Sequence, residues 1–250
     1  MKKAWLVSFI RFPMLIMALL LFLLLLKIFG LPFQFPYLPE FSNVYFTLVN
    51  VLCFCLLYHL LKKEGRSFKD LIDFRRERVV KDISFGLLWL LVLYVPFVLT
   101  VMGIMFVLYG PDLFEHFATV FAGNEEIFIF PRPQWLLWVT ASISFIFPFL
   151  NAPIEELMYR GYAQPLFINH YKKVWVGIII PAVGFALQHV ILAVSLQGAI
   201  IYTAAFFVWG IGSGFIFHKQ KRLFPLIVCH FFVNIVFAIL PLIFLILGQS

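Results

Sequence analysis

Three short patterns place strongly polar side chains inside apolar stretches of the chain. They are Glu155-Glu156-x-x-x-Arg160, Phe185-x-x-x-His189 and His230-x-x-x-Asn234. A charge at bilayer depth costs about 3 kcal/mol on insertion scales, and such residues are seldom kept there without a role. Glutamate and histidine are also the side chains that most often move protons in catalysis. These residues are therefore the first candidates for chemistry.

The first pattern suggests a division of labour between the two glutamates. On a helix Glu156 and Arg160 are four residues apart and can pair on one face, whereas Glu155 is rotated by about 100°. Pro153 suits the first turn of a helix, so we expect both carboxylates near its positive end. Glu156 and Arg160 would form a structural ion pair, and Glu155 would be free for chemistry. The alternative is a salt-bridge cluster of all three residues at the headgroups.

The second and third patterns are ambiguous when each is taken alone. His189 could be a hydrogen-bonded packing residue, and His230 and Asn234 could join two helices by hydrogen bonds. Asn234 could instead orient a partner of His230 or donate to an oxyanion. The acidic pair, the two histidines and the asparagine account for most strongly polar groups in the apolar segments of the C-terminal half. We therefore expect them to avoid lipid by facing one another.

Composition assigns the chain to the polytopic membrane proteins. Of its 250 residues 63% are hydrophobic and 12% are charged, and the mean hydropathy is +1.01, whereas about a quarter of the residues are charged in soluble domains. We predict an all-α transmembrane helical bundle of seven or eight membrane segments, forming one domain over residues 1–250 with a motif-bearing core at 134–247. Arg11, within the first span, is expected to extend toward the near headgroups. The predicted spans are 6–28, 42–61, 83–109, 134–152, 174–194, 198–217 and 223–247, with a further helix at 153–170.

Basic residues lie in alternate connections, which predicts the orientation. Seven alternating spans put the N-terminus and the 62–82 loop in the cytoplasm, and Ser250 outside. The opposite connections, 30–41 and 110–133, have one base, Arg132, and five acids: Glu40, Asp112, Glu115, Glu125 and Glu126. The formal charge of +7 then reflects topology and attraction to anionic lipid, and nucleic acid is not an expected partner.

Together, in this order and on successive apolar segments, the three patterns resemble the motifs of the CPBP (Abi) family of intramembrane proteases. That family includes the CAAX-processing prenyl-protein endopeptidases and bacterial relatives of the bacteriocin-immunity and lysostaphin-resistance type. The resemblance covers residues 148–240 closely, and no motif position departs from it. The first 130 residues resemble the family only as hydrophobic spans.

The resemblance implies hydrolysis of a peptide bond in a membrane-associated peptide or protein. Glu155 would be the general base, His189 would position the water, and His230 with Asn234 would orient it or stabilise the oxyanion. Glu156, Arg160 and Phe185 would support the site. Glu155, His189 and His230 could also supply three ligands to a catalytic zinc ion. A glutamate acting directly on water requires no metal, and the HExxH ligand pair is absent.

Other classes of function stay open at this stage. A serine protease would use Ser213 with His230, but the glycines around Ser213 suit close helix packing. A proton-coupled transporter or a non-catalytic membrane regulator could also carry these polar groups. Within the protease class, the basic loops suit a bacterial plasma membrane, and peptide maturation or bacteriocin immunity is the favoured role.

One geometric difficulty remains in the sequence. His189 lies 15 residues after Val174, about 22 Å along a helix, whereas His230 is only about 10 Å from Leu223. Simple alternation of spans does not place His189 and His230 at the same depth in the membrane. Either the 153–170 helix re-enters the membrane, or Pro181 and tilting displace the fifth span.

Overall fold

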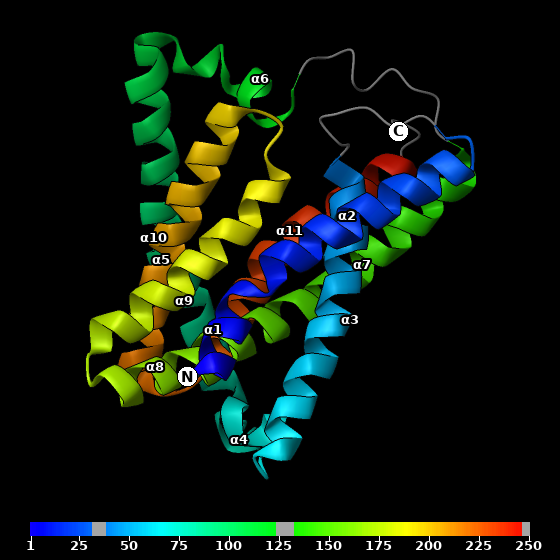
Figure 1. Cartoon of the computed structure of the whole chain (residues 1–250). Coiled ribbons are helices and arrows are strands. Elements are labelled where there is room, and N and C mark those ends of the chain that lie inside the picture. Colours follow the sequence, from blue (N-terminus) through cyan, green and yellow to red (C-terminus); the bar gives the residue numbers. More distant parts are fainter. Residues whose placement is uncertain (32–38, 124–132, 247–250) are drawn as a thin grey trace.

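The computed structural model describes residues 1–31, 39–123 and 133–246, and within these ranges the chain is helical and contains no strand (Figure 1). The principal helices are α1 (Lys2–Phe9), α2 (Arg11–Ile28), α3 (Pro39–Lys63), α4 (Phe68–Ile72), α5 (Val79–Tyr109), α6 (Phe117–Phe121), α7 (Gln134–Glu156), the π-helical η4 (Leu157–Ala163), α8 (Gln164–Tyr171), α9 (Val174–His189), α10 (Leu196–Gln220) and α11 (Phe224–Ile246).

Six helical stretches among the described residues are long and apolar enough to cross a membrane. They are Arg11–Ile28, Phe41–Lys63, Phe68–Phe114, Gln134–Tyr171, Val174–Leu192 and Leu196–Gln220, and a shorter apolar helix covers Phe224–Ile239. Their outward side chains are large and apolar: Leu91 is 66% exposed and Val107 83% exposed. Lipid is the medium that makes such exposure stable. The predicted membrane helical bundle is thus confirmed.

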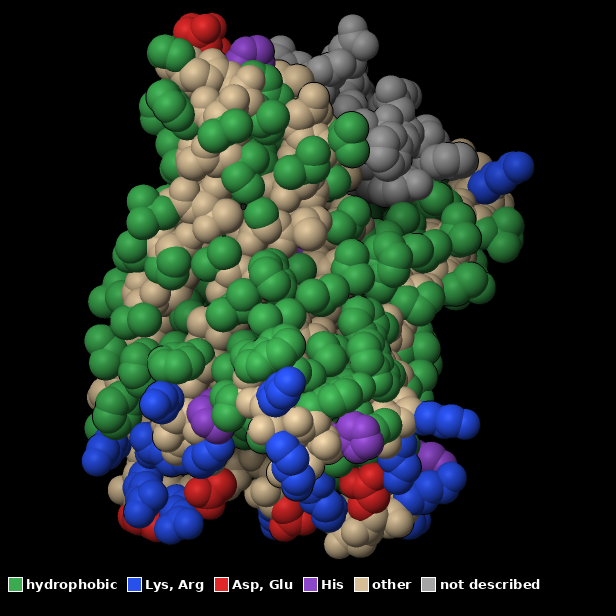
Figure 2. Space-filling model, turned by 60° about the vertical axis from the view of Figure 1, so that its left-hand side comes forward, with side chains coloured by type: hydrophobic (Ala, Val, Ile, Leu, Met, Phe, Trp, Pro, Cys, Tyr) green, Lys and Arg blue, Asp and Glu red, His purple; other side chains and the backbone are tan. Residues whose placement is uncertain are grey.

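Charged side chains concentrate at one end of the bundle. Figure 2 shows lysine and arginine side chains gathered below a broad apolar band. The N-terminus, α4 and α8 lie at this same end in Figure 1, and Lys3 at the N-terminus forms an ion pair with Glu64, directly after α3. The basic connections therefore share one side. Of the residues assigned to the opposite side, Glu125, Glu126 and Arg132 lie outside the described residues, as does the terminal Ser250, and the side chain of Glu40 is likewise not described.

Two helices differ from the sequence predictions. The predicted span 6–28 is divided at Ile10 into α1 and α2. Pro13 explains the break, because it has no N–H for the carbonyl of Phe9 and its ring crowds that carbonyl. The predicted helix at 153–170 is no separate membrane segment, since it continues α7 through η4 into α8.

Pro153 lies inside α7 rather than in a first turn. The prediction that the acidic pair sits at a helix N-terminus was therefore wrong: Glu155 and Glu156 are the last residues of α7. Prolines are tolerated inside membrane helices where neighbouring groups and local changes of helical pitch compensate for the missing hydrogen bond. The π-helical turn that begins at Leu157 is such a change, and π-helical turns recur at functional sites.

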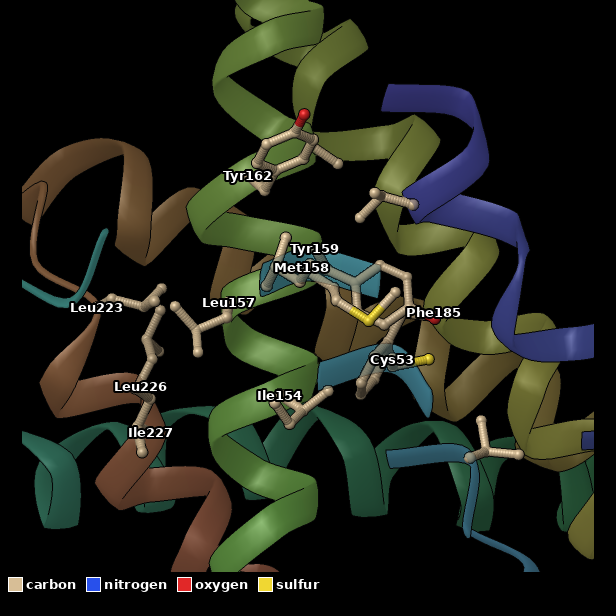
Figure 3. Packing of buried hydrophobic residues seen from close by; sticks show 14 of the residues in the cluster. Cys53, Ile154, Leu157, Met158, Tyr159, Tyr162, Phe185, Leu223, Leu226 and Ile227 are labelled. Carbon is tan, nitrogen blue, oxygen red and sulfur yellow. The ribbon is translucent and has the colours of Figure 1, made fainter. Parts of the chain in front are cut away.

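The helix that carries the acidic pair runs through the centre of the fold. α7 packs against α3 and α11, while α9 packs against α10. Figure 3 shows this helix between Leu226 and Ile227 of α11, with Leu223 just before α11, on one side and Phe185 and Cys53 on the other. Met158 and Tyr159 are completely buried. The backbone that presents the two carboxylates is therefore held on all sides by close packing.

Candidate active site

Each carboxylate of the acidic pair is buried and has its own arginine. Oε1 of Glu156 lies 3.1 Å from an Nη of Arg160, so the ion pair predicted from the four-residue spacing is present. Oε1 of Glu155 lies 2.8 Å from an Nη of Arg11, and both of these side chains have no exposed surface. The two adjacent negative charges are thus neutralised separately, one by an arginine near the N-terminus and the other by an arginine one helical turn further on.

Arg11 does not extend to the headgroups, and that prediction was wrong. Its guanidinium donates to carboxylate and amide oxygens on three other helices: Oε1 of Gln188 (2.5 Å), Oδ1 of Asn50 (2.8 Å), Oδ1 of Asn151 (3.2 Å) and Oε1 of Glu155 (2.8 Å). Snorkelling lowers the cost of a charge that has no partner in the membrane. Here the interior supplies four acceptors, so the buried position is satisfied.

Sequence reasoning did not include Arg11, Asn50 or Gln188 among the site residues. Each could have been recognised from the sequence, because each is a strongly polar residue within an apolar run. Gln188 also directly precedes the motif histidine His189.

His230 lies between the two carboxylates. Its Nδ1 is 3.0 Å from Oε1 of Glu156, and its Nε2 is 3.5 Å from Oε2 of Glu155. A carboxylate only accepts hydrogen bonds, so Nδ1 carries the proton and donates a hydrogen bond to Glu156. The distance to Glu155 is too long for a normal hydrogen bond. In the neutral imidazole, the lone pair of Nε2 therefore faces Glu155 without bonding to it.

His189 is oriented by its own helix and by an aromatic ring. Its Nδ1 lies 2.7 Å from the carbonyl oxygen of Phe185, which identifies Nδ1 as the donor. The imidazole stacks on Phe206 with ring centroids 3.5 Å apart. These contacts fix the plane of the ring and leave Nε2 as its second nitrogen.

Phe185 is the common neighbour of the motif residues. Its ring centroid is 4.7 Å from that of His189 and 6.0 Å from that of His230. The guanidinium carbon of Arg160 lies 4.5 Å from the same centroid, within cation–π range. The first position of the Phe185-x-x-x-His189 motif thus separates and supports the polar groups of the other two motifs.

These contacts answer the difficulty of depth along the helices. His189 and His230 both lie against Phe185, and Glu155 lies next to His230, although the sequence places the two histidines at different distances along their helices. Figure 1 shows α9 strongly inclined to the neighbouring α10.

Several buried polar atoms around this cluster have no hydrogen-bond partner among the described residues. They include Oε2 of Glu155, Oε2 of Glu156 and Nδ2 of Asn234. Asn234 is one helical turn beyond His230 on the same face of α11. A buried polar group without a partner is costly, and at a functional site it is explained by water or a ligand.

Ser213 has a structural position. Its hydroxyl accepts from Arg160 at 2.5 Å and donates to the carbonyl oxygen of Trp209 at 2.6 Å. The neighbouring Gly210 sits so close to α9 that an added Cβ would lie 2.9 Å from that of Ala182. These contacts support the interpretation that the glycines allow close helix packing. They also show that the hydroxyl of Ser213 is occupied by its hydrogen bond with Arg160.

The candidate zinc ligands do not form a metal site in this arrangement. Within the described residues, no three His, Cys, Asp or Glu side chains are grouped so that they could hold one ion. Oε1 of Glu155 is bonded to Arg11, and Nδ1 of His230 is bonded to Glu156. These bonds leave Oε2 of Glu155 and Nε2 of His230 as the atoms that a metal would take, and with His189 they are not grouped around one point as placed; the chemistry below is derived without a metal.

Comparison with protein-family models matches residues 133–236 to one family. That family is described as "Type II CAAX prenyl endopeptidase Rce1-like". The matched segment contains all three motifs and excludes Arg11 and Asn50. Searches of curated proteins and of solved structures gave no match. The resemblance to a CAAX-type membrane protease, predicted from the motifs, is confirmed for this segment. The match indicates a protease that acts in a membrane.

Proposed function

We propose that the protein is an intramembrane endopeptidase that hydrolyses a peptide bond of a membrane-associated peptide or protein, with Glu155 as the general base. The observation that carries this proposal is the buried, unpartnered Oε2 of Glu155, 3.5 Å from Nε2 of His230. One water molecule can bond to both atoms at this separation. That water would donate one proton toward Glu155 and the other toward His230.

The chemistry begins when Oε2 of Glu155 takes a proton from the bound water. The resulting hydroxide attacks the carbonyl carbon of the scissile bond, and a tetrahedral oxyanion forms. Glu155 then returns the proton to the leaving nitrogen, and the C–N bond breaks. The products are a carboxylic acid and an amine, and the carboxylate of Glu155 is regenerated.

The remaining motif residues have supporting roles in this proposal. His189 presents Nε2 as an acceptor to the water, and Asn234 presents an unpartnered amide donor to the oxyanion. Glu156 fixes the tautomer of His230, and Arg160 neutralises Glu156. Phe185 keeps the imidazole of His189 in place through its carbonyl oxygen. A buried site of this kind excludes bulk water, which strengthens each of these interactions.

The substrate is expected to approach from the cytoplasmic side of the membrane. The concentration of basic residues at one end of the bundle supports this orientation by the positive-inside rule, and the acidic pair lies on the same continuous helix as α8, which is at that end. A CAAX-type substrate is anchored by a lipid near its C-terminus. Peptide maturation or bacteriocin immunity in a bacterial plasma membrane is the cellular role we favour.

The test is cleavage of a defined peptide by the full chain in liposomes. The probe is a fluorescence-quenched peptide that ends in a farnesylated CAAX sequence, measured beside its unprenylated form on a membrane anchor. Wild-type protein should cleave at least one probe, and Glu155→Gln should reduce kcat by about a thousandfold or more because it removes the base. Gln retains an oxygen for Arg11, so folding should persist. Equal cleavage by Glu155→Gln and wild type would exclude Glu155 as the base.

A further inference from the structure

The buried ion pair between Arg11 and Glu155 connects the N-terminal segment to the acidic motif. The two residues are 144 positions apart, and Arg11 lies outside the matched segment 133–236. Neither side chain has exposed surface. A guanidinium at this depth is stable only when its donors are occupied.

The guanidinium is held in one orientation by groups from three helices. Asn50 of α3, Gln188 of α9 and Asn151 of α7 accept from it, in addition to Glu155. A planar group with four acceptors around it cannot rotate without breaking several hydrogen bonds. Arg11 is therefore a rigid reference point for the carboxylate that it contacts.

The backbone before Arg11 is also fixed at close range. A Cβ added at Gly184 would lie only 1.8 Å from the carbonyl oxygen of Ser8. Only glycine permits this approach between α1 and α9. Since α1 ends at Phe9 and α2 begins at Arg11, the same contact sets the place at which the guanidinium enters the core.

The contact divides the two oxygens of Glu155 between different roles. Oε1 is bonded to Arg11, while Oε2 has no hydrogen-bond partner among the described residues and faces His230. Without the bond to Oε1, the carboxylate could rotate about its terminal torsion, which is broad and soft. Both oxygens would then compete for His230 and for the water.

Resting on the proposed function, we propose that Arg11 is a positioning residue for the general base: it fixes the carboxylate plane of Glu155 and directs Oε2 toward the catalytic water. The polar contacts of the N-terminal third thereby complete a site whose motifs all lie in the C-terminal half.

Two substitutions in the full chain test this role, with kcat and KM measured in liposomes on the farnesylated CAAX probe. Arg11→Lys keeps the charge but cannot reach four acceptors with a planar fork. It should reduce kcat by about tenfold, with KM within about twofold of wild type and little change in the thermal unfolding midpoint. Arg11→Gln should reduce kcat further, by about a hundredfold. The matched control is Arg222→Lys, which alters the ion pair of Arg222 with Asp82 at the basic end of the bundle and should leave both constants near wild type.

Each outcome decides the inference. Wild-type kcat in Arg11→Lys and Arg11→Gln would overturn it, as would a rise in KM at constant kcat. Loss of folding in both variants would assign Arg11 to the fold alone and would overturn it too. The proposed function fails separately, if Glu155→Gln cleaves the probe like wild type. An inactive Glu155→Gln beside fully active Arg11 variants would reject only the positioning role.

Discussion

Nδ1 of His230 lies 3.0 Å from Oε1 of Glu156, and this contact determines which ring nitrogen faces Glu155. The proton on Nδ1 is committed to Glu156, so Nε2 is available as an acceptor on the side of the proposed water. In the proposed mechanism, the second glutamate of the motif thus acts through the histidine. Its own carboxylate is neutralised by Arg160.

The first prediction concerns His189 and Asn234. His189→Ala should lower kcat by about a hundredfold or more, and Asn234→Ala by about tenfold, because each removes a group that orients water or stabilises the oxyanion. Cleavage of the quenched CAAX probe measures both. His170→Ala, at an exposed histidine of α8, is the control and should keep full activity. Near wild-type cleavage by His189→Ala would contradict its place in the site.

The second prediction separates Glu156 and Arg160 from the general base. Glu156→Gln and Arg160→Ala should each destabilise the protein by about 3 to 5 kcal/mol, because one member of a buried pair is left without its partner. Arg160→Ala should be the worse of the two, since Arg160 also donates to Ser213. Unfolding in detergent gives the measurement. A double variant, Glu156→Gln with Arg160→Ala, should lose less stability than the sum of the single changes. Strict additivity would indicate that the two side chains do not interact.

The third prediction addresses metal dependence. Protein treated with a strong chelator and freed of zinc should retain full cleavage of the probe, because in the proposed mechanism Glu155 acts on water directly. Elemental analysis should find far less than one ion per chain. Activity lost on chelation and restored by zinc would instead show that His189, His230 and Glu155 rearrange around a metal. In that case His189→Ala should also abolish zinc binding.

The fourth prediction is a pH dependence of stability at the basic end. Glu64 accepts from Lys3 at 2.8 Å and from Tyr162 at 2.7 Å. Burial alone would raise the pKa of the Glu64 carboxyl, but these hydrogen bonds outweigh it and lower the pKa below its ordinary value. A lowered folded-state pKa contributes stability that is complete above the unfolded pKa, about 4.3, and is lost as the pH falls through the folded value.

Glu64→Gln should therefore be less stable than wild type at pH 7, by less than about 1 kcal/mol because the carboxylate is partly exposed. The difference should shrink as the pH falls below about 4. Thermal unfolding midpoints across this range provide the measurement, with Glu77→Gln, an exposed carboxylate at the same end, as the control. A difference that grows toward low pH would contradict the assignment.

The fifth prediction is the orientation in the membrane. In a background without native cysteines, Glu115→Cys should react with an impermeant thiol reagent added to intact cells, and Lys69→Cys should react only after lysis. Both side chains are exposed, and they lie at the two ends of the long helical stretch Phe68–Phe114. The reverse labelling pattern would place the acidic pair near the outer face, and the substrate would then approach from there.

The local parts of this structure were predictable from the sequence. The apolar runs predicted the membrane helices, and the spacing of Glu156 and Arg160 predicted their ion pair, because both depend only on residues within a few turns. The depth at which His189 and His230 meet was not predictable. It depends on how α9 and α11 pack against the other helices rather than on the length of their own apolar runs.

Arg11 shows the same limit more sharply. A lone arginine near one end of an apolar run favours snorkelling, and that rule considers only the residue and the lipid. Its acceptors come from α3, α7 and α9, so its burial is a property of the assembled bundle. The prediction from Pro153 was wrong for a different reason. In soluble proteins a proline usually marks the first turn of a helix, but in a membrane helix it can lie in the interior.

The distance in sequence between Arg11 and Glu155 also imposes an order on biogenesis. The arginine leaves the ribosome 144 residues before its carboxylate partner, an interval on the order of ten seconds at usual elongation rates. During that time the first apolar segment carries an uncompensated cation, which the headgroup region accommodates better than the hydrocarbon. The segment can settle in its final place only after α7 and α9 have been made. Assembly of the proposed catalytic carboxylate with its arginine and docking of the N-terminus are thus one late event, and a chain interrupted before residue 155 carries no partially formed site.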